Sequence, residues 1–168
     1  QAGATALVSS EGRWSYQQLA EWSLGIAGQL LSAEVRPGDR VAVVMHKGAA
    51  QIASCLAIQA AGAAYVPLSA DTPAARLQTI IHGSDIRVLL TQPEYQAQLT
   101  DIASSAQQQN TAAAHTADAN SVKPLFVTLV VDAAQPQYGN TLPLIARQVT
   151  DAAYVIYTSG STGVPKGV

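Results

Sequence analysis

Residues 158–166 hold the side chains of this sequence that are best suited to chemistry on a phosphate group. The stretch reads TSGSTGVPK, with four hydroxyl side chains, two glycines and one lysine. Glycines let the backbone turn its N–H groups toward an anion, hydroxyls donate hydrogen bonds, and the lysine adds a positive charge. We therefore expect a phosphate-binding loop whose contacts come from Thr158, Ser159, Gly160, Ser161, Thr162, Gly163 and Lys166.

The residues that precede this loop predict a strand. Residues 154–157 read YVIY, a β-branched and aromatic composition that is typical of a buried parallel strand. The loop is not a Walker A motif, which needs G-x-x-x-x-G-K-[ST]. Counting from Gly160, Pro165 precedes the lysine and Gly167 follows it. A polar, turn-rich loop without a ligand is the remaining alternative, but the order of strand, hydroxyls, glycines and lysine favours phosphate binding.

The same string resembles the signature loop TSGSTGxPKG of the adenylate-forming (ANL) enzyme superfamily. That superfamily comprises adenylation domains of nonribosomal peptide synthetases, acyl-CoA and aryl-CoA synthetases, and luciferases. Its loop handles the β- and γ-phosphates of ATP while a carboxylate attacks the α-phosphate. The resemblance implies that the seven residues named above hold and screen the departing pyrophosphate.

A second segment directs the resemblance toward one branch of the superfamily. Residues 56–68, LAIQAAGAAYVPL, are similar to the segment L-x-x-x-K-A-G-A-A-Y-V-P-L-D of peptide synthetase adenylation domains. WSYQQL at 14–19 is a weaker match to the early pattern [LW]-[ST]-Y-x-x-L. Ala60 stands in place of the family's lysine and Ser69 in place of its aspartate. The resemblance identifies residues 1–168 as the N-terminal portion of an AMP-binding (adenylation) domain of a peptide synthetase.

The resemblance also implies an activity for the parent protein. An amino acid, or another carboxylic acid, attacks MgATP to give an acyl adenylate and pyrophosphate, and a carrier-protein phosphopantetheine thiol then takes the acyl group. The implied cofactors are ATP, Mg²⁺ and phosphopantetheine, and the implied partners are the acid substrate and the carrier and condensation-type domains of an assembly line. The family's remaining motifs would follow Val168, so we expect no catalytic residue in this fragment and no activity from the fragment alone. A fragment of an acyl-CoA or aryl-CoA synthetase and a non-catalytic docking platform are the alternatives.

Alternating helices and strands must position the loop. Apolar periodicity and turn residues predict helices at Tyr16–Ser32, 48–61, 73–82 and 93–104, and strands at 40–45, 63–68, 87–90 and 125–131. This alternation implies right-handed crossovers and a mainly parallel sheet flanked by helices. The fold class is therefore α/β, and the resemblance makes it the N-terminal subdomain of the adenylate-forming fold.

Local signals mark three helix starts and one break. Ser15 opens an S-x-x-Q capping box, Thr72 is an N-cap ahead of a proline, and Thr91 with Glu94 repeats the capping box. Residues 101–121 lose all periodicity and fill with Ala, Gln, Asn, Ser and Thr. We expect a flexible surface loop there.

Composition limits the possible partners. The net charge is −2, the pI is near 5.8, and no basic block occurs, so we expect no nucleic acid. No apolar run approaches the roughly 18 residues that span a bilayer, which predicts no membrane contact and a cytoplasmic location.

The single cysteine, Cys55, is interpreted as a small core residue, and the three histidines show no metal-ligand spacing. Asp132 follows a predicted strand and could face a cleft.

Overall fold

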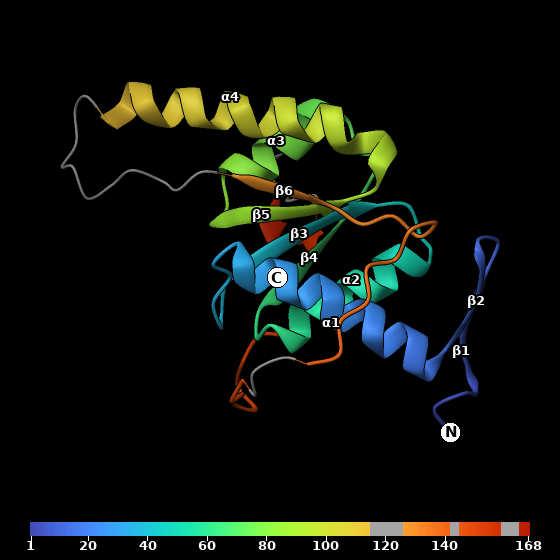
Figure 1. Ribbon diagram of the computed structural model, residues 1–168. Coiled ribbons are helices and arrows are strands. Elements are labelled where there is room, and N and C mark those ends of the chain that lie inside the picture. Colours follow the sequence, from blue (N-terminus) through green and yellow to red (C-terminus); the bar gives the residue numbers. More distant parts are fainter. Residues whose placement is uncertain (115–125, 142–144, 159–164) are drawn as a thin grey trace.

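A computed structural model describes residues 1–114, 126–141, 145–158 and 165–168 of the chain. Its centre is a parallel sheet with the spatial order β4-β3-β5-β6 (Figure 1). The strands are β3 (Arg40–Met45), β4 (Ala64–Ser69), β5 (Ile86–Thr91) and β6 (Val127–Val130). The predicted α/β class with a parallel sheet flanked by helices is confirmed.

Helices cover both faces of this sheet. They are α1 (Tyr16–Ser32), α2 (Ala49–Ala60), α3 (Ala74–His82) and α4 (Gln96–Ala114), with a 3₁₀ turn η1 (Pro93–Tyr95) ahead of α4. The α1 and α2 side packs on Val41, Val43 and Met45 of the central strand, and the α3 and α4 side on Ala42 and Val44. Because side chains alternate along a strand, one buried run supplies both cores. In the described part of the chain, no helix combines the length and apolarity that a membrane crossing requires.

Both ends of α1 follow from local sequence. The predicted capping box is confirmed: Gln18 N–H donates to Ser15 Oγ (3.2 Å), and Ser15 N–H donates to Gln18 Oε1 (2.9 Å). At the other end, Val35 N–H donates to Leu30 O and Glu34 N–H to Leu31 O. These bonds form a Schellman motif in which Glu34, with φ 60°, takes the left-handed position that usually belongs to glycine.

A hairpin at the N-terminus has no counterpart in the sequence prediction. Strands β1 (Thr5–Ser9) and β2 (Gly12–Ser15) pair antiparallel, and Trp14 of β2 stacks on Trp22 of α1 with ring centroids 6.1 Å apart. In the turn of the hairpin, Glu11 Oε2 accepts a hydrogen bond from Ala49 N–H (3.2 Å) at the start of α2. The hairpin thus caps a helix whose own N-cap, Gly48, has no side chain.

Two predicted helix starts are wrong. Thr72 is not the N-cap of α3: Pro73 holds that place, and its carbonyl accepts the first helical bonds, from Arg76 and Leu77. Thr91 does not cap the helix after it, because it is the last residue of β5 and its buried hydroxyl donates to Val44 O (2.9 Å) on the neighbouring strand. The Thr91 hydroxyl that the predicted capping box requires therefore bonds to the neighbouring strand instead.

The stretch predicted as a flexible loop, 101–121, is helical in its first part. Helix α4 continues through Ala114, and residues 115–121 lie outside the described residues. Alanine and glutamine favour helix by propensity even where no apolar period is present. The loss of periodicity therefore did not mark the end of the helix.

Candidate phosphate site

The chain reaches the predicted phosphate loop along the outer edge of β4. Val155 N–H donates to Tyr65 O (3.0 Å) and Tyr65 N–H donates to Ala153 O (3.3 Å). These bonds form a parallel bridge between Tyr65 and Tyr154, whose rings lie 5.6 Å apart. The parallel direction predicted for residues 154–157 is therefore present at this bridge.

The prediction of a buried strand at 154–157 is wrong. Tyr154 and Ile156 are 50% and 46% exposed, and pairing with β4 is confined to the single bridge. Residues alternate along β4, so the next residue after Tyr65 to face this edge is Pro67, which has no N–H to donate. The strand therefore separates from the sheet one step beyond the bridge.

Beyond the bridge the chain forms a short antiparallel pair, β7 (Tyr157–Thr158) with β8 (Lys166–Gly167). Thr158 lies opposite Lys166, and its Oγ1 donates to Lys166 O (3.5 Å). Ile156 and Val168 continue the ladder with two backbone bonds, of 2.9 and 3.0 Å. The two ends of the loop are thus held together, and directly opposite side chains of such a pair project from the same face.

Two of the seven predicted site residues can be placed. Thr158 and Lys166 are both exposed and are the described residues at the two ends of the loop. Ser159, Gly160, Ser161, Thr162 and Gly163 lie outside the described residues. The pairing places the side chains of Thr158 and Lys166 on the same face of the ladder, where the lysine supplies a positive charge that suits an anion.

Gly167, in β8, lies close to Val155 and Tyr157 because it has no side chain. A Cβ built on Gly167 would lie 2.9 Å from Val155 Cγ1 and 3.1 Å from Tyr157 Cζ. Sequence reasoning used this glycine to exclude a Walker A motif and as the last glycine of the signature TSGSTGxPKG, but gave it no structural role. Its position directly after the lysine that ends a hydroxyl-rich loop was the signal from which this close contact could have been predicted.

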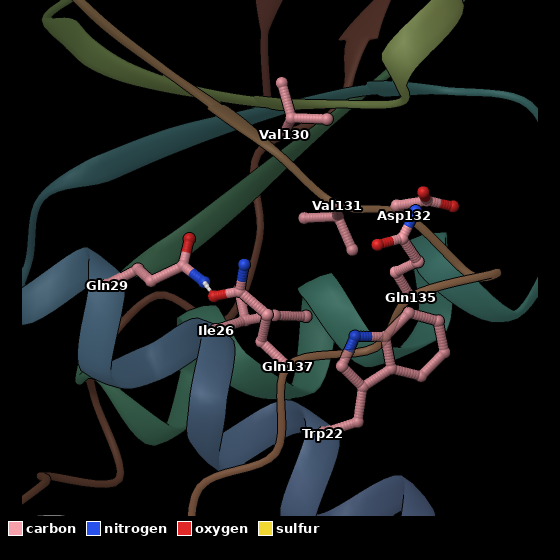
Figure 2. A pocket seen from close by; sticks show the side chains of 8 residues that line it. All are labelled: Trp22, Ile26, Gln29, Val130, Val131, Asp132, Gln135 and Gln137. Carbon is pink, nitrogen blue, oxygen red and sulfur yellow. Dashed lines mark hydrogen bonds between the residues drawn. The ribbon is translucent and has the colours of Figure 1, made fainter.

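Asp132 does line a pocket, as its place after a strand suggested. Figure 2 shows this pocket, of about 220 Å³, between Trp22 and Ile26 of α1 and the residues that follow β6. The carboxylate Oδ1 of Asp132 accepts a hydrogen bond from Ala134 N–H (2.8 Å), which closes a local turn. Thr158 and Lys166, the described ends of the predicted phosphate loop, do not line this pocket.

A polar contact among three crossover loops was missed by sequence reasoning, which gave the histidines no role. His46, after β3, contacts the hydroxyl of Tyr95 through Nε2 and places Nδ1 3.7 Å from Asp71 Oδ2. The backbone N–H of His46 also donates to Gln92 Oε1 (2.9 Å). In the described part of the chain, no group of three or more His, Cys, Asp or Glu side chains could hold a metal ion.

Comparison with known proteins places the chain in a family. A family model described as AMP-binding enzyme matches residues 1–168. The chain belongs to this family, as the resemblance of its loop predicted.

The curated relatives define the branch of the family more closely. The chain is 33% identical to phenyloxazoline synthase MbtB of Mycobacterium sp. (strain MCS), over 98% of the chain and 12% of the relative. It is 34% identical to the nonribosomal peptide synthetase vlms of Lecanicillium sp., over 99% of the chain and 2% of the relative. It is 36% identical to pyochelin synthetase PchE of Pseudomonas aeruginosa (strain UCBPP-PA14), over 98% and 10%. The chain thus spans about an eighth or less of the length of these three relatives.

Solved structures agree on the fold. The chain matches the nonribosomal peptide synthetase FmoA3 in its α-methyl-L-serine-AMP bound form with a TM-score of 0.71 and 33% identity, over 99% of the chain and 16% of that structure. It matches ATP-bound MatB from Rhodopseudomonas palustris with a TM-score of 0.75 and 22% identity, over 99% and 31%. At that lower identity the likeness shows the fold alone. The predicted fold of the adenylate-forming enzymes is confirmed.

Proposed function

We propose that this chain is the N-terminal portion of a nonribosomal peptide synthetase adenylation domain and carries its pyrophosphate-handling loop. The observation that carries the proposal is the pairing of Thr158 with Lys166 at the two ends of TSGSTGVPK. Similarity to multidomain synthetases over 98% of the chain supports it.

The proposed reaction of the whole protein is the activation of an amino acid, or another carboxylic acid, by ATP. The carboxylate attacks the α-phosphorus, an acyl adenylate forms, and pyrophosphate leaves. Thr158 and Lys166, with Ser159, Gly160, Ser161, Thr162 and Gly163, hold the β- and γ-phosphates and screen their charge. Their role is to bind and orient the leaving group, since adenylyl transfer, like phosphoryl transfer, depends mainly on positioning and electrostatics.

Mg²⁺ enters this proposal only as the ion that accompanies ATP. The described residues offer no group of side chains that could hold a metal by themselves, so no step is assigned to a metal bound by this chain.

The acyl group then passes to the phosphopantetheine of a carrier domain, and condensation-type domains of the same cytoplasmic assembly line take it further. These partners are proposed by similarity to multidomain synthetases.

Carboxylate-dependent exchange of pyrophosphate into ATP tests the proposed function. The assay uses a protein that joins this chain to the regions present in its relatives, and compares Lys166→Ala with Lys47→Ala, which also removes one exposed lysine. Loss of a charge-assisted contact of about 1.5–3 kcal/mol predicts a roughly 10- to 150-fold lower kcat/KM for MgATP in Lys166→Ala. Lys47→Ala should retain the wild-type value.

Three results would contradict the proposal. Equal pyrophosphate exchange by the Lys166 and Lys47 variants would show that Lys166 does not contribute to pyrophosphate handling. Absence of exchange with every acid tested would favour the non-catalytic docking platform. Transfer to free CoA in place of a carrier domain would favour an acyl-CoA or aryl-CoA synthetase. The chain of 168 residues alone should show no exchange above its Lys166→Ala variant.

A further inference from the structure

The connection between β6 and the phosphate loop passes from one edge of the sheet to the other. This crossing segment comprises residues 131–156, of which 142–144 lie outside the described residues. It leaves β6 with Val131 N–H bonded to Thr91 O (2.7 Å) and ends with Val155 N–H bonded to Tyr65 O beside β4. In Figure 1 it is the orange to red trace that runs across α1 and α2.

The segment contacts α1 along one stripe of the helix. Glu21, Gly25 and Gln29 are spaced by four residues, so they lie on one side of α1. Gly139 N–H donates to Glu21 O (2.8 Å), and Gln29 Nε2 donates to Gln137 Oε1 (2.7 Å), a bond drawn in Figure 2. Two hydrogen bonds therefore flank the position of Gly25.

At Gly25 itself, backbone meets backbone. A Cβ on Gly25 would lie 2.0 Å from Gln137 O, and a Cβ on Gly139 would lie 2.8 Å from Gly25 N. Neither position can accept a side chain unless the main chain of the segment moves, because the atoms in the way belong to the backbone. Gly28, three residues further along the same helix, has no other group within 4 Å of a built Cβ.

The end of α2 also contacts the segment, but here the segment contributes side chains. A Cβ on Gly62 would lie 2.9 Å from Ile145 Cγ2, and Arg147 Nη1 donates to Gln59 O. The segment is thus attached at residues 137–139, at 145–147 and at 153–155. Six residue steps separate each attachment from the next, so at most about 20 Å of chain joins neighbouring attachments.

We propose that Gly25 and Gly62 are positioning residues for the phosphate loop. They let the crossing segment lie directly on α1 and on the end of α2, and the segment in turn holds the strand that leads into the loop against β4. The effect of these glycines on ATP binding rests on the proposed function. Their effect on the position of the crossing segment can be tested without an activity assay.

The structural test compares Gly25→Ala with Gly28→Ala in the chain of 168 residues by amide hydrogen exchange. Gly25→Ala should accelerate exchange at Gly139 and also at Val155, each at least tenfold, while Gly28→Ala leaves both at the wild-type rate. Acceleration at Gly139 alone, or at neither amide, overturns the proposal. If Gly25→Ala does not fold, Gly139→Ala leaves α1 unaltered, and the comparison is then made at the amide of Val155.

The functional test uses the protein that joins the chain to the regions of its relatives. At a temperature where all variants are folded, Gly25→Ala should raise KM for MgATP at least fivefold and leave KM for the carboxylic acid unchanged. A purely structural role would change neither KM, and that result also overturns the proposal. If the wild-type protein shows no pyrophosphate exchange, the proposed function fails, and the hydrogen-exchange comparison alone decides the positioning role.

Discussion

Thr158 and Lys166 are opposite partners in an antiparallel pair, although eight positions separate them in the sequence. The bond from Thr158 Oγ1 to Lys166 O and the two bonds between Ile156 and Val168 hold the ends of the hydroxyl-rich loop together. A loop closed in this manner loses less conformational freedom when it binds an anion than a loop with free ends. The pairing therefore supports the pyrophosphate-binding role that we propose for this loop.

Substitution of Gly167 should open this pair. In Gly167→Val the new side chain meets Val155 and Tyr157, so we expect the ladder to separate and the amides of Ile156 and Val168 to exchange at least tenfold faster. Hydrogen exchange of the 168-residue chain measures this. Gly3→Val is the control, because nothing lies within 4 Å of a Cβ at Gly3. Unchanged exchange in Gly167→Val would show that the pair tolerates a side chain there.

The ends of α1 and α2 offer a matched pair of substitutions. Both helices close with the same two backbone bonds, but the left-handed position is Glu34 in one and Gly62, with φ 81°, in the other. A non-glycine residue in the left-handed conformation destabilises the folded state by about 1–2 kcal/mol. Replacing it with glycine removes this strain, but glycine loses more conformational entropy on folding, which offsets part of the gain. Glu34→Gly should therefore raise the free energy of unfolding by roughly 0.5–1 kcal/mol.

Gly62→Ala should have the opposite effect. The same backbone conformation and the contact with Ile145 predict a loss of about 1–2 kcal/mol or more in the free energy of unfolding. Urea denaturation of both variants under one set of conditions provides the comparison. Changes of the same sign in the two variants would contradict the assignment of these motifs.

Two ion pairs should differ in their contribution to stability. Asp39 Oδ2 accepts bonds from Arg87 Nη2 and from Arg36 N–H, both 2.9 Å, and about a third of each paired side chain is exposed. Asp85 lies 3.9 Å from Arg40 and is 87% exposed. We expect Asp39→Ala to lower the free energy of unfolding by about 1–2 kcal/mol and Asp85→Ala to leave it unchanged in urea denaturation. Equal losses would show that burial and bond number do not separate the pairs.

Cys55 should react slowly and affect stability at high pH. Burial raises the pKa of its thiol to about 11, whereas an unfolded chain has a cysteine pKa of about 8.5. At pH 8 a disulfide reagent should therefore modify the folded chain at least tenfold more slowly than the chain in urea.

The pH dependence has a defined sign. Because the folded pKa is raised, the contribution of the thiol to stability is complete below about pH 8.5 and is lost as the pH rises toward 11. Cys55→Ala should lose less stability over that interval than the wild type, as measured by urea denaturation at a series of pH values. A parallel decline in both proteins would exclude ionisation of this thiol as a cause.

The sequence by itself determined the elements whose signals are local. The bounds of α1 and of β3 were predicted to the residue, because a capping box and a run of buried apolar residues act on their own neighbours. The likeness of residues 158–166 to a known loop also identified the family.

Only the tertiary structure decided which neighbours compete for a group and which distant segments meet. The hydroxyl of Thr91 bonds across the sheet in place of capping a helix. Pairing of the strand before the predicted phosphate loop with β4 stops at one bridge, and the next residue of β4 that faces this edge is Pro67, which has no N–H to donate. The contact of Gly25 with Gly139 joins residues more than a hundred positions apart. Such contacts depend on how strands pair and helices pack, and no pattern within a short window of sequence contains that information.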